Sequence, residues 1–245
     1  MKNFYLDIVI KPYLITLIKS FKSKTRREGK ETNWGLCFSF AIKDSIWFKK
    51  TAINPGRWAM GFPALYALYR ILNDIHPKNI LEFGLGESSK FTSQYQMVFT
   101  DANLTIIEHD LTWYETFNNN IFSVSDYVSI LPIVKEKWFG KKCYTYENLM
   151  PVIKGHKYDF VIIDGPWGSN SFSRPQIIDI IENDLLDKQF IILLDDVERY
   201  GERQTLELIY KTLNKKGIGF NKGLYTGVKE TVVITSNNYR FLTSM

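Results

Sequence analysis

The chain has 245 residues, of which 45% are hydrophobic and 15% aromatic, so it can bury the core of an α/β domain. Its formal net charge is +5, and the basic excess is concentrated from Lys19 to Lys30, which argues against a nucleic-acid-binding surface on the body. Only two cysteines occur, Cys37 and Cys143, and they lack CxxC spacing. This pattern argues against a zinc site or a disulfide framework and favours a cytoplasmic setting.

We expect residues 1–50 to form an N-terminal extension to a domain of residues 51–245. Phe4 to Phe21 is rich in apolar side chains and precedes a run of basic residues. Charged residues and a proline interrupt it, which leaves no unbroken segment of about 18 apolar residues to span a bilayer: Asp7, Lys11 and Pro12. Two alternatives remain open. The segment is either a helix packed on the body or on a second subunit of a homodimer, or an interfacial helix at an anionic membrane surface.

Residues 31–50 alternate aromatic and polar side chains irregularly, which predicts short strands or loops. A helix is expected from about Gly61, with Pro63 in its first turn. His76 and Pro77 should end this helix, because proline cannot continue it.

The most informative stretch runs from Asn79 to Ser89. Its apolar part ends in Gly84 and Gly86, and Ser88 then opens a polar stretch, which predicts a buried strand, a tight turn and the start of a helix. Glycine is needed where so sharp a turn presses the backbone against a ligand. The free N–H groups of the helix would form a polar cradle for a nucleotide-like ligand.

Glu82 stands two residues before the first glycine. This acid-x-Gly-x-Gly ending of a first strand resembles the first motif of class I S-adenosylmethionine-dependent methyltransferases. The resemblance implies that S-adenosylmethionine is the cofactor and that Gly84, Gly86 and Ser88 belong to its binding site, with the glycines beside its methionine part. It also implies that Glu82 helps to organise the amino group of the cofactor. The alternative for Glu82 is a solvated side chain beside an ordinary strand–helix turn.

A second strand is predicted from Leu104 to Asp110. In dinucleotide and methyltransferase folds, an acid that ends this strand accepts hydrogen bonds from ribose hydroxyls. Glu108 is the candidate, since a carboxylate offers two acceptor oxygens to a vicinal diol. Asp110 should cap a helix over residues 111–119, and His109 is expected to face solvent.

Three elements without assigned site residues are expected next. A third strand should cover residues 127–134, and a short helix should lie near residues 147–153. A further helix should follow the polar loop of residues 169–174 and extend to about Leu186.

Acidic residues end the fourth and fifth predicted strands. Asp164 follows the apolar run of residues 160–163, and Asp195 and Asp196 follow that of residues 189–194. Adjacent parallel strands lie about 4.8 Å apart, so these carboxylates can converge, and converging carboxylates need a cation such as Mg²⁺ or Mn²⁺. Because successive strand residues face opposite ways, we expect one of Asp195 and Asp196 to reach the crevice.

These acids resemble the metal site of catechol-type O-methyltransferases, in which an aspartate after strand four and an Asp-Asn pair after strand five hold the ion. The resemblance implies a metal held by Asp164, Asp195 and Asp196. Two departures stand out, since Asp196 replaces the asparagine and no lysine follows Asp164. The alternative is that Asp164 binds cofactor or substrate directly while Asp196 caps the next helix. Without a metal, Asp164 or Asp195 is the candidate catalytic base.

The sequence Asp164-Gly165-Pro166 is also similar to glucuronoxylan-type sugar O-methyltransferases and to methyltransferase-like proteins encoded among bacterial polysaccharide genes. This likeness covers residues 79–204 and implies a sugar hydroxyl as the acceptor. Trp167 would then stack on a sugar ring, and Arg174 or Arg199 would hold a carboxylate or phosphate. Surface packing and ordinary salt bridges are the alternatives for these three residues.

The C-terminal part predicts the topology. Residues 217–225 and 229–236 are strand-like, and the link between them permits only a hairpin. We therefore expect an α/β, Rossmann-like fold: a seven-stranded, mostly parallel sheet with an antiparallel last strand and helices on both faces, similar to the class I methyltransferase sheet.

The expected function is S-adenosylmethionine-dependent O-methylation of a sugar, a glycan or another small hydroxyl acceptor, with or without a divalent metal. Three alternatives are kept. An NAD-dependent oxidoreductase would need helices in place of the hairpin. A glycosyltransferase would use acids at a strand end without the acid-x-Gly-x-Gly motif, and a binding module would keep the fold without the activity.

Overall fold

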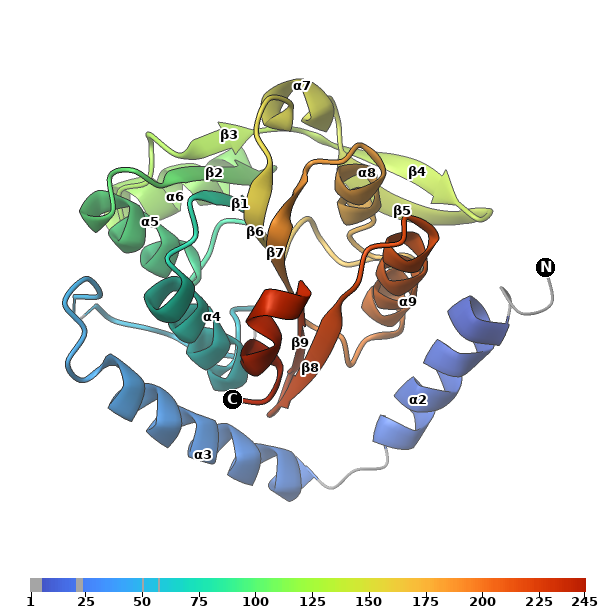
Figure 1. Cartoon of the computed structure of the whole chain (residues 1–245), viewed down its shortest axis with the longest axis horizontal. Coiled ribbons are helices and arrows are strands. Elements are labelled where there is room, and N and C mark those ends of the chain that lie inside the picture. The colour runs from blue at the N-terminus through green and yellow to red at the C-terminus, as the bar shows by residue number, and fades with distance from the viewer. Residues whose placement is uncertain (1–5, 21–23, 50, 57) are drawn as a thin grey trace.

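The computed structural model describes residues 6–20, 24–49, 51–56 and 58–245. Among these residues, seven strands form a sheet in the order β3–β2–β1–β6–β7–β9–β8 (Figure 1). β9 runs antiparallel to both of its neighbours, whereas the other neighbouring pairs are parallel. The strands of this sheet are β1 (Asn79–Phe83), β2 (Asn103–Glu108), β3 (Val128–Ile130), β6 (Tyr158–Ile163), β7 (Leu186–Leu194), β8 (Asn221–Thr226) and β9 (Glu230–Thr235).

This topology confirms the expected fold class. β8 and β9 form the predicted hairpin, and β9 inserts between β7 and β8, with Leu194 opposite Val232 and Val232 opposite Leu224. An oxidoreductase sheet of two dinucleotide-binding halves would continue with a parallel strand at this position. The reversed strand therefore does not favour that alternative.

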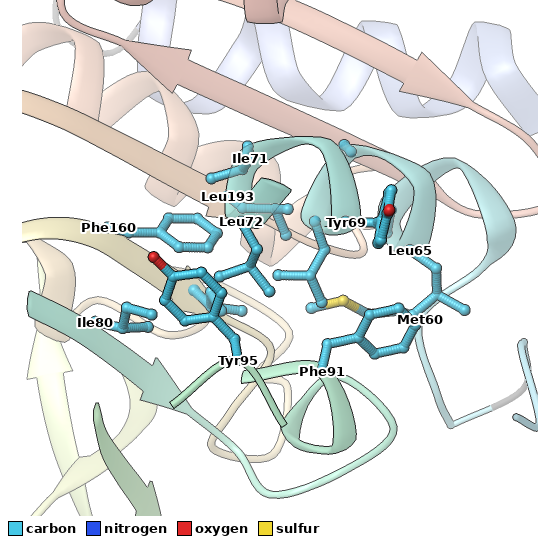
Figure 2. Packing of buried hydrophobic residues seen from close by; sticks show 14 of the residues in the cluster. Met60, Leu65, Tyr69, Ile71, Leu72, Ile80, Phe91, Tyr95, Phe160 and Leu193 are labelled. Carbon is cyan, nitrogen blue, oxygen red and sulfur yellow. The ribbon is translucent and has the colours of Figure 1, made fainter. Parts of the chain in front are cut away.

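Helices cover both faces of the sheet, because the central strands are apolar on both faces. One face carries α4 (Phe62–Ile75), α5 (Ser89–Val98) and α6 (Leu111–Asn120), and the other carries α7 (Leu149–Ile153), α8 (Gln176–Glu182) and α9 (Tyr200–Lys215). Each face has its own hydrophobic core, and alternate residues of β6 point into different cores. Phe160 belongs to the first core, under α4, α5 and α6, and Val161 belongs to the second core, under α7, α8 and α9. Figure 2 shows the first core, where Leu72 of α4 and Tyr95 of α5 pack towards Ile80 and Phe160.

The N-terminal segment begins with a π-helical turn, η1 (Leu6–Ile10), which leads directly into α2 (Lys11–Ser20). α2 lies beside α9, on the outside of the sheet (Figure 1). Within the described ranges, no helix is both long enough and apolar enough to cross a membrane.

The short strands or loops expected after residue 30 are wrong, because α3 (Lys24–Ile42) occupies much of this region. Trp34 and Phe38 are one helical turn apart and project from the same side. Their rings pack on α4, with centroid distances of 5.2 Å from Trp34 to Tyr66 and 5.9 Å from Phe38 to Phe62. Phe40, which is exposed, obscured the helical period in the sequence.

The single third strand expected over residues 127–134 is also wrong. β3 ends at Ile130, and Pro132 separates it from β4 (Ile133–Trp138), since proline has no N–H to donate within a strand. β4 pairs with β5 (Lys141–Tyr146) in a separate antiparallel hairpin. α8 is shorter than expected, because Leu186 already belongs to β7. The chain ends in a 3₁₀ segment, η2 (Asn237–Thr243).

Candidate active site

A cavity of about 1240 Å³ opens at the carboxyl ends of β1, β2, β6 and β7. In open α/β sheets, ligands bind at this edge, next to the point where the strand order reverses. The loops that follow the four strands line the cavity, together with residues 54–56 and 58–59 ahead of α4. Pockets for a single small ligand measure about 300–1,000 Å³, so this one has room for a nucleoside and a second molecule.

Two glycines allow the loops after β1 and β6 to cross in direct backbone contact. A Cβ atom on Gly84 would lie 2.9 Å from the backbone N of Gly165, and a Cβ on Gly165 would lie 2.7 Å from the Cα of Gly84. Gly84 also has φ of +93°, a conformation that residues with a side chain rarely adopt. Both glycines line the cavity, so this crossing forms part of its wall.

Gly86 has a different reason to be glycine. A Cβ at this position would meet nothing within 4 Å, and its φ lies outside the left-handed range. Gly86 lines the cavity, and its N–H donates to Ser89 Oγ over 3.0 Å. The missing side chain therefore leaves space that belongs to the cavity.

Glu82 does not line the cavity, which changes the role expected for it. The side chain is completely buried and accepts hydrogen bonds from the hydroxyls of Ser88 (2.5 Å), Ser89 (2.8 Å) and Thr92 (2.6 Å). Burial raises the pKa of Glu82 more than these hydroxyls lower it. Ser88 is likewise buried and directed at Glu82. Both residues join β1 to the start of α5 beneath the glycine turn, and neither side chain lines the cavity.

Glu108 lines the cavity and is held by backbone groups. Its Oε1 accepts from the N–H of His109 (2.6 Å) and of Asp110 (2.8 Å), and its Oε2 accepts from the N–H of Leu85 (2.8 Å). Burial raises the pKa of Glu108, but the hydrogen bonds from His109, Asp110 and Leu85 outweigh it and lower the pKa. The result is an ionised carboxylate at the end of β2, the position from which ribose hydroxyls are bound in such folds.

His109 was expected to face solvent, and this is wrong. Its side chain is only 10% exposed and lines the cavity, with Nδ1 2.8 Å from Glu108 Oε1. The ring lies 4.7 Å from that of Trp167, edge to face. In the part of the chain that the structure describes, His109 Nε2 has no hydrogen-bond partner. Asp110 caps α6 as predicted, since Oδ1 accepts from the N–H of Trp113.

Asp164, Asp195 and Asp196 converge as the strand spacing predicts, with one carboxylate oxygen from each within 4.8 Å of the others. Asp164 and Asp196 line the cavity. Asp195 is wholly buried beneath them and accepts a hydrogen bond from the Thr231 hydroxyl. Asp196 is therefore the acid of the pair that reaches the crevice. Asp195 does not line the cavity, so the structure does not favour it as a base for a bound acceptor.

Two protein cations already lie among these oxygens. Lys229 Nζ is 2.9 Å from Asp196 Oδ1 and 3.4 Å from Asp195 Oδ2. Arg174 Nη2 is 3.1 Å from Asp196 Oδ2 and 3.3 Å from Asp164 Oδ1. A divalent ion bound to the three carboxylates would have to lie against both cations, so these residues do not fit the Mg²⁺ or Mn²⁺ site expected from the sequence. The converging acids do need positive charge, and Lys229 and Arg174 supply it.

Protonation differs between the two acids that face the cavity. Burial raises the pKa of Asp164 well above its ordinary value, and the charges of Asp195 and Asp196 raise it further against the opposing effect of Arg174. Burial also acts on Asp196, but Arg174, Lys229 and Arg199 outweigh it and lower the pKa of that carboxyl. Asp196 therefore holds the negative charge, and Asp164 is the group that can take up a proton.

Comparison with known proteins bears on the fold. No protein-family model matches the chain, and no curated protein matches it in sequence. The O-methyltransferase TomG from Streptomyces achromogenes, which is involved in tomaymycin synthesis and was solved with S-adenosylmethionine, is similar in structure. Its TM-score is 0.51 at 14% identity, and the match covers 89% of this chain and 100% of TomG. The fold is that of a class I methyltransferase.

A second similar structure is also that of an O-methyltransferase. The O-methyltransferase from Bacillus cereus, solved with S-adenosylhomocysteine, has a TM-score of 0.48 and 14% identity, over 86% of this chain and 91% of that one. At these identities the likeness concerns the methyltransferase fold.

The three residues expected to contact the acceptor differ in their surroundings within this methyltransferase fold. Trp167 is 59% exposed at the cavity, and the Arg199 side chain is 42% exposed with Nη1 3.0 Å from Asp196 Oδ2. Arg174 is buried, and besides its acid partners it donates to the carbonyl oxygens of Pro166 (3.3 Å) and Asp195 (3.4 Å). Arg174 is therefore an internal cation of the site, whereas Trp167 and Arg199 remain candidates for binding an acceptor.

Sequence reasoning missed Lys229, although one signal could have found it. An antiparallel final strand beside β7 begins where β7 ends, so residues just before β9 must lie near Asp195 and Asp196. It also missed Trp113, whose Nε1 donates to the Leu85 carbonyl over 2.8 Å at the cavity wall of the methyltransferase fold. No local motif marks that residue.

Glu198, on the same loop as Asp196, gives a test of how burial affects stability. Burial and the nearby Asp196 raise the pKa of Glu198 from 4.5 to about 7. Below pH 4.5 both the folded and the unfolded chain hold this proton. As the pH rises towards 7 only the folded chain keeps it, so the contribution of Glu198 to stability falls by up to about 3 kcal/mol.

We predict that Glu198→Gln removes this part of the pH dependence and makes the protein more stable than the wild type at pH 8. The glutamine can still accept the hydrogen bond that Glu198 Oε2 takes from the N–H of Glu230. Urea denaturation at several pH values between 5 and 8 measures the difference. Glu115→Gln, at an exposed glutamate of α6, is the matched control. Parallel stability curves for wild type and Glu198→Gln would contradict the prediction.

Proposed function

We propose that this protein is an S-adenosylmethionine-dependent methyltransferase that methylates a hydroxyl oxygen of a sugar, a glycan or another small acceptor without a divalent metal. The observation that carries the proposal is the set of residues that line a single cavity. The open space at Gly86, the ionised Glu108 and the proton-accepting Asp164 all line it.

The residues at the β1 and β2 ends fit the cofactor. The bare turn at Gly84 and Gly86 leaves room for the methionine part, and Glu108 can accept hydrogen bonds from the two ribose hydroxyls. When bound, S-adenosylmethionine supplies a methyl group on a positively charged sulfur. Transfer to the acceptor oxygen would form an oxygen–carbon bond and break the carbon–sulfur bond, and the electron pair would stay on the sulfur.

The protein's own part in this reaction is placement and proton transfer. Holding two reactants in line contributes about 7–11 kcal/mol to the lowering of a barrier. Asp164 takes the proton of the acceptor hydroxyl, because its raised pKa makes it a stronger base than an ordinary aspartate. Arg174, which lies 3.3 Å from Asp164 Oδ1, keeps this carboxyl oriented.

The sugar acceptor is supported by the rim of the cavity. Trp167 presents an exposed aromatic face, and such faces stack on the apolar side of sugar rings. Arg199 is half-exposed nearby and suits a carboxylate or phosphate on the same molecule. Transfer of labelled methyl groups to a panel of hydroxyl-bearing sugars, uronic acids and catechols tests this choice, and methylation of catechols alone would contradict it.

Calorimetric titration tests the proposal as a whole. S-adenosylhomocysteine should bind with measurable heat, and NAD should not. The absence of heat with S-adenosylhomocysteine would overturn the methyltransferase proposal. Binding without transfer to any acceptor would instead favour the non-catalytic binding module.

We predict that prolonged dialysis against EDTA leaves methyl transfer unchanged, within about twofold, because Lys229 and Arg174 already neutralise the acids. Added Mg²⁺ or Mn²⁺ should likewise have no effect. The measurement is initial rate with and without each ion after dialysis. A loss of rate that Mg²⁺ or Mn²⁺ restores would show that the acids bind a metal.

A further inference from the structure

The N-terminal helical segment, η1 and α2, has one side that is packed on the body. Ile8 is completely buried in the core cluster that includes residues of α9, and the Tyr13 ring lies 6.3 Å from that of Tyr200. Two ion pairs reinforce this contact, Lys11 to Glu207 at 3.5 Å and Asp7 to Lys211 at 3.4 Å. The packed-helix alternative therefore describes one side of the segment.

The other side carries large aliphatic residues that solvent reaches. They are spaced four residues apart, so they form one stripe along the helix, and their exposed fractions are 57% for Leu6, 39% for Ile10, 49% for Leu14 and 64% for Ile18. An exposed apolar stripe of this length is unusual on a soluble surface and marks a contact with a partner or a membrane.

The charge of the chain around this segment indicates which contact. Residues 1–30 contain eight basic and two acidic residues, a net charge of +6, whereas the whole chain has +5. Residues 31–245 together therefore carry −1. If a second copy of the chain packed on this stripe, two positively charged N-terminal regions would lie together and repel each other. An anionic lipid surface would instead attract this region.

We propose that η1 and α2 lie in the plane of an anionic membrane surface, with Leu6, Ile10, Leu14 and Ile18 inserted among the lipid chains, and that the positive charge of residues 1–30 attracts the segment to the headgroups. The segment has the two signals that stable, reversible attachment needs, an apolar face and a basic cluster. α9 connects it to the cavity, because Tyr200 both contacts Tyr13 and lines the cavity. Attachment thus holds one rim of the cavity beside the membrane.

Vesicle flotation with the full chain tests the proposal. The wild type should bind phosphatidylcholine vesicles that contain about 30% phosphatidylglycerol, and should bind pure phosphatidylcholine far more weakly. The double variant Leu14→Glu/Ile18→Glu should lower binding by at least about 30-fold, since it removes apolar area and adds negative charge. The matched control is Met97→Glu/Val98→Glu, at exposed residues of α5, which should bind like the wild type.

A charge series separates the electrostatic contribution. Lys22→Gln/Lys24→Gln should weaken binding about 25-fold, at roughly fivefold per charge, and Lys141→Gln/Lys142→Gln on β5 should leave it unchanged. Equal binding by wild type and the α2 variant would overturn the proposal, as would equal binding to neutral vesicles. So would a dimer in sedimentation that Leu14→Glu/Ile18→Glu converts to a monomer without any lipid binding by the wild type. S-adenosylhomocysteine titration of each variant shows that the cavity is intact and keeps this test separate from that of the methyltransferase.

Discussion

Gly86→Val should increase the dissociation constant of S-adenosylhomocysteine by at least about 100-fold and should leave the melting temperature unchanged. The valine side chain would occupy space at the cavity wall where a Cβ meets no protein atom within 4 Å. It therefore excludes ligand without disturbing the packing of the protein. Titration calorimetry measures the binding, and thermal unfolding in the absence of ligand measures the stability.

Two other glycines are controls for this prediction. Gly29→Val makes the same chemical change on α3, where a Cβ also meets open space, and should bind like the wild type. Gly84→Ala should instead lower the stability, because its Cβ would lie 2.9 Å from the backbone N of Gly165 and its φ is +93°. Normal binding by Gly86→Val would mean that the cofactor does not pass this turn.

Asp164→Asn should reduce the turnover number by about 10²–10⁴-fold while S-adenosylhomocysteine binding is retained. Asparagine preserves the shape and the contact with Arg174 but cannot accept the acceptor's proton. In the wild type the raised pKa keeps Asp164 protonated at low pH, so turnover should rise with pH as the carboxyl ionises. The variant should lose this rise in a profile of rate against pH.

The variant Asp195→Asn distinguishes the role of Asp195 from that of Asp164. Asp195 is buried below the cavity and accepts a hydrogen bond from Thr231. Its replacement should therefore lower the melting temperature, whereas the turnover number of the protein that remains folded should change little. Thermal unfolding and active-site titration distinguish these effects. A loss of turnover in Asp195→Asn with full activity in Asp164→Asn would reverse the two assignments.

Much of this arrangement is readable in the sequence because its signals are local. The apolar runs before Gly84, Glu108 and Asp164 mark parallel strands, and parallel strands present their ends at one edge. The short link before β9 likewise fixes an antiparallel hairpin. These features therefore predict the mostly parallel sheet, its antiparallel last strand and which acids meet.

Other features depend on contacts between distant residues, which local patterns do not carry. Whether Glu82 faces a ligand or three hydroxyls depends on how α5 starts. Whether His109 faces solvent depends on Trp167, which comes from another loop. Whether the acids leave room for a metal likewise depends on a distant residue, since Lys229 reaches them from the C-terminal hairpin.

The position of Lys229 means that the three acids are neutralised only after the C-terminal hairpin has been synthesised. A nascent or truncated chain that stops before the C-terminal hairpin already contains the glycine turn and all three acids. It lacks the ammonium that lies 2.9 Å from Asp196 Oδ1 and 3.4 Å from Asp195 Oδ2. Such a fragment carries each recognisable motif of the fold, yet its acids would repel one another until the last strand is released and docks.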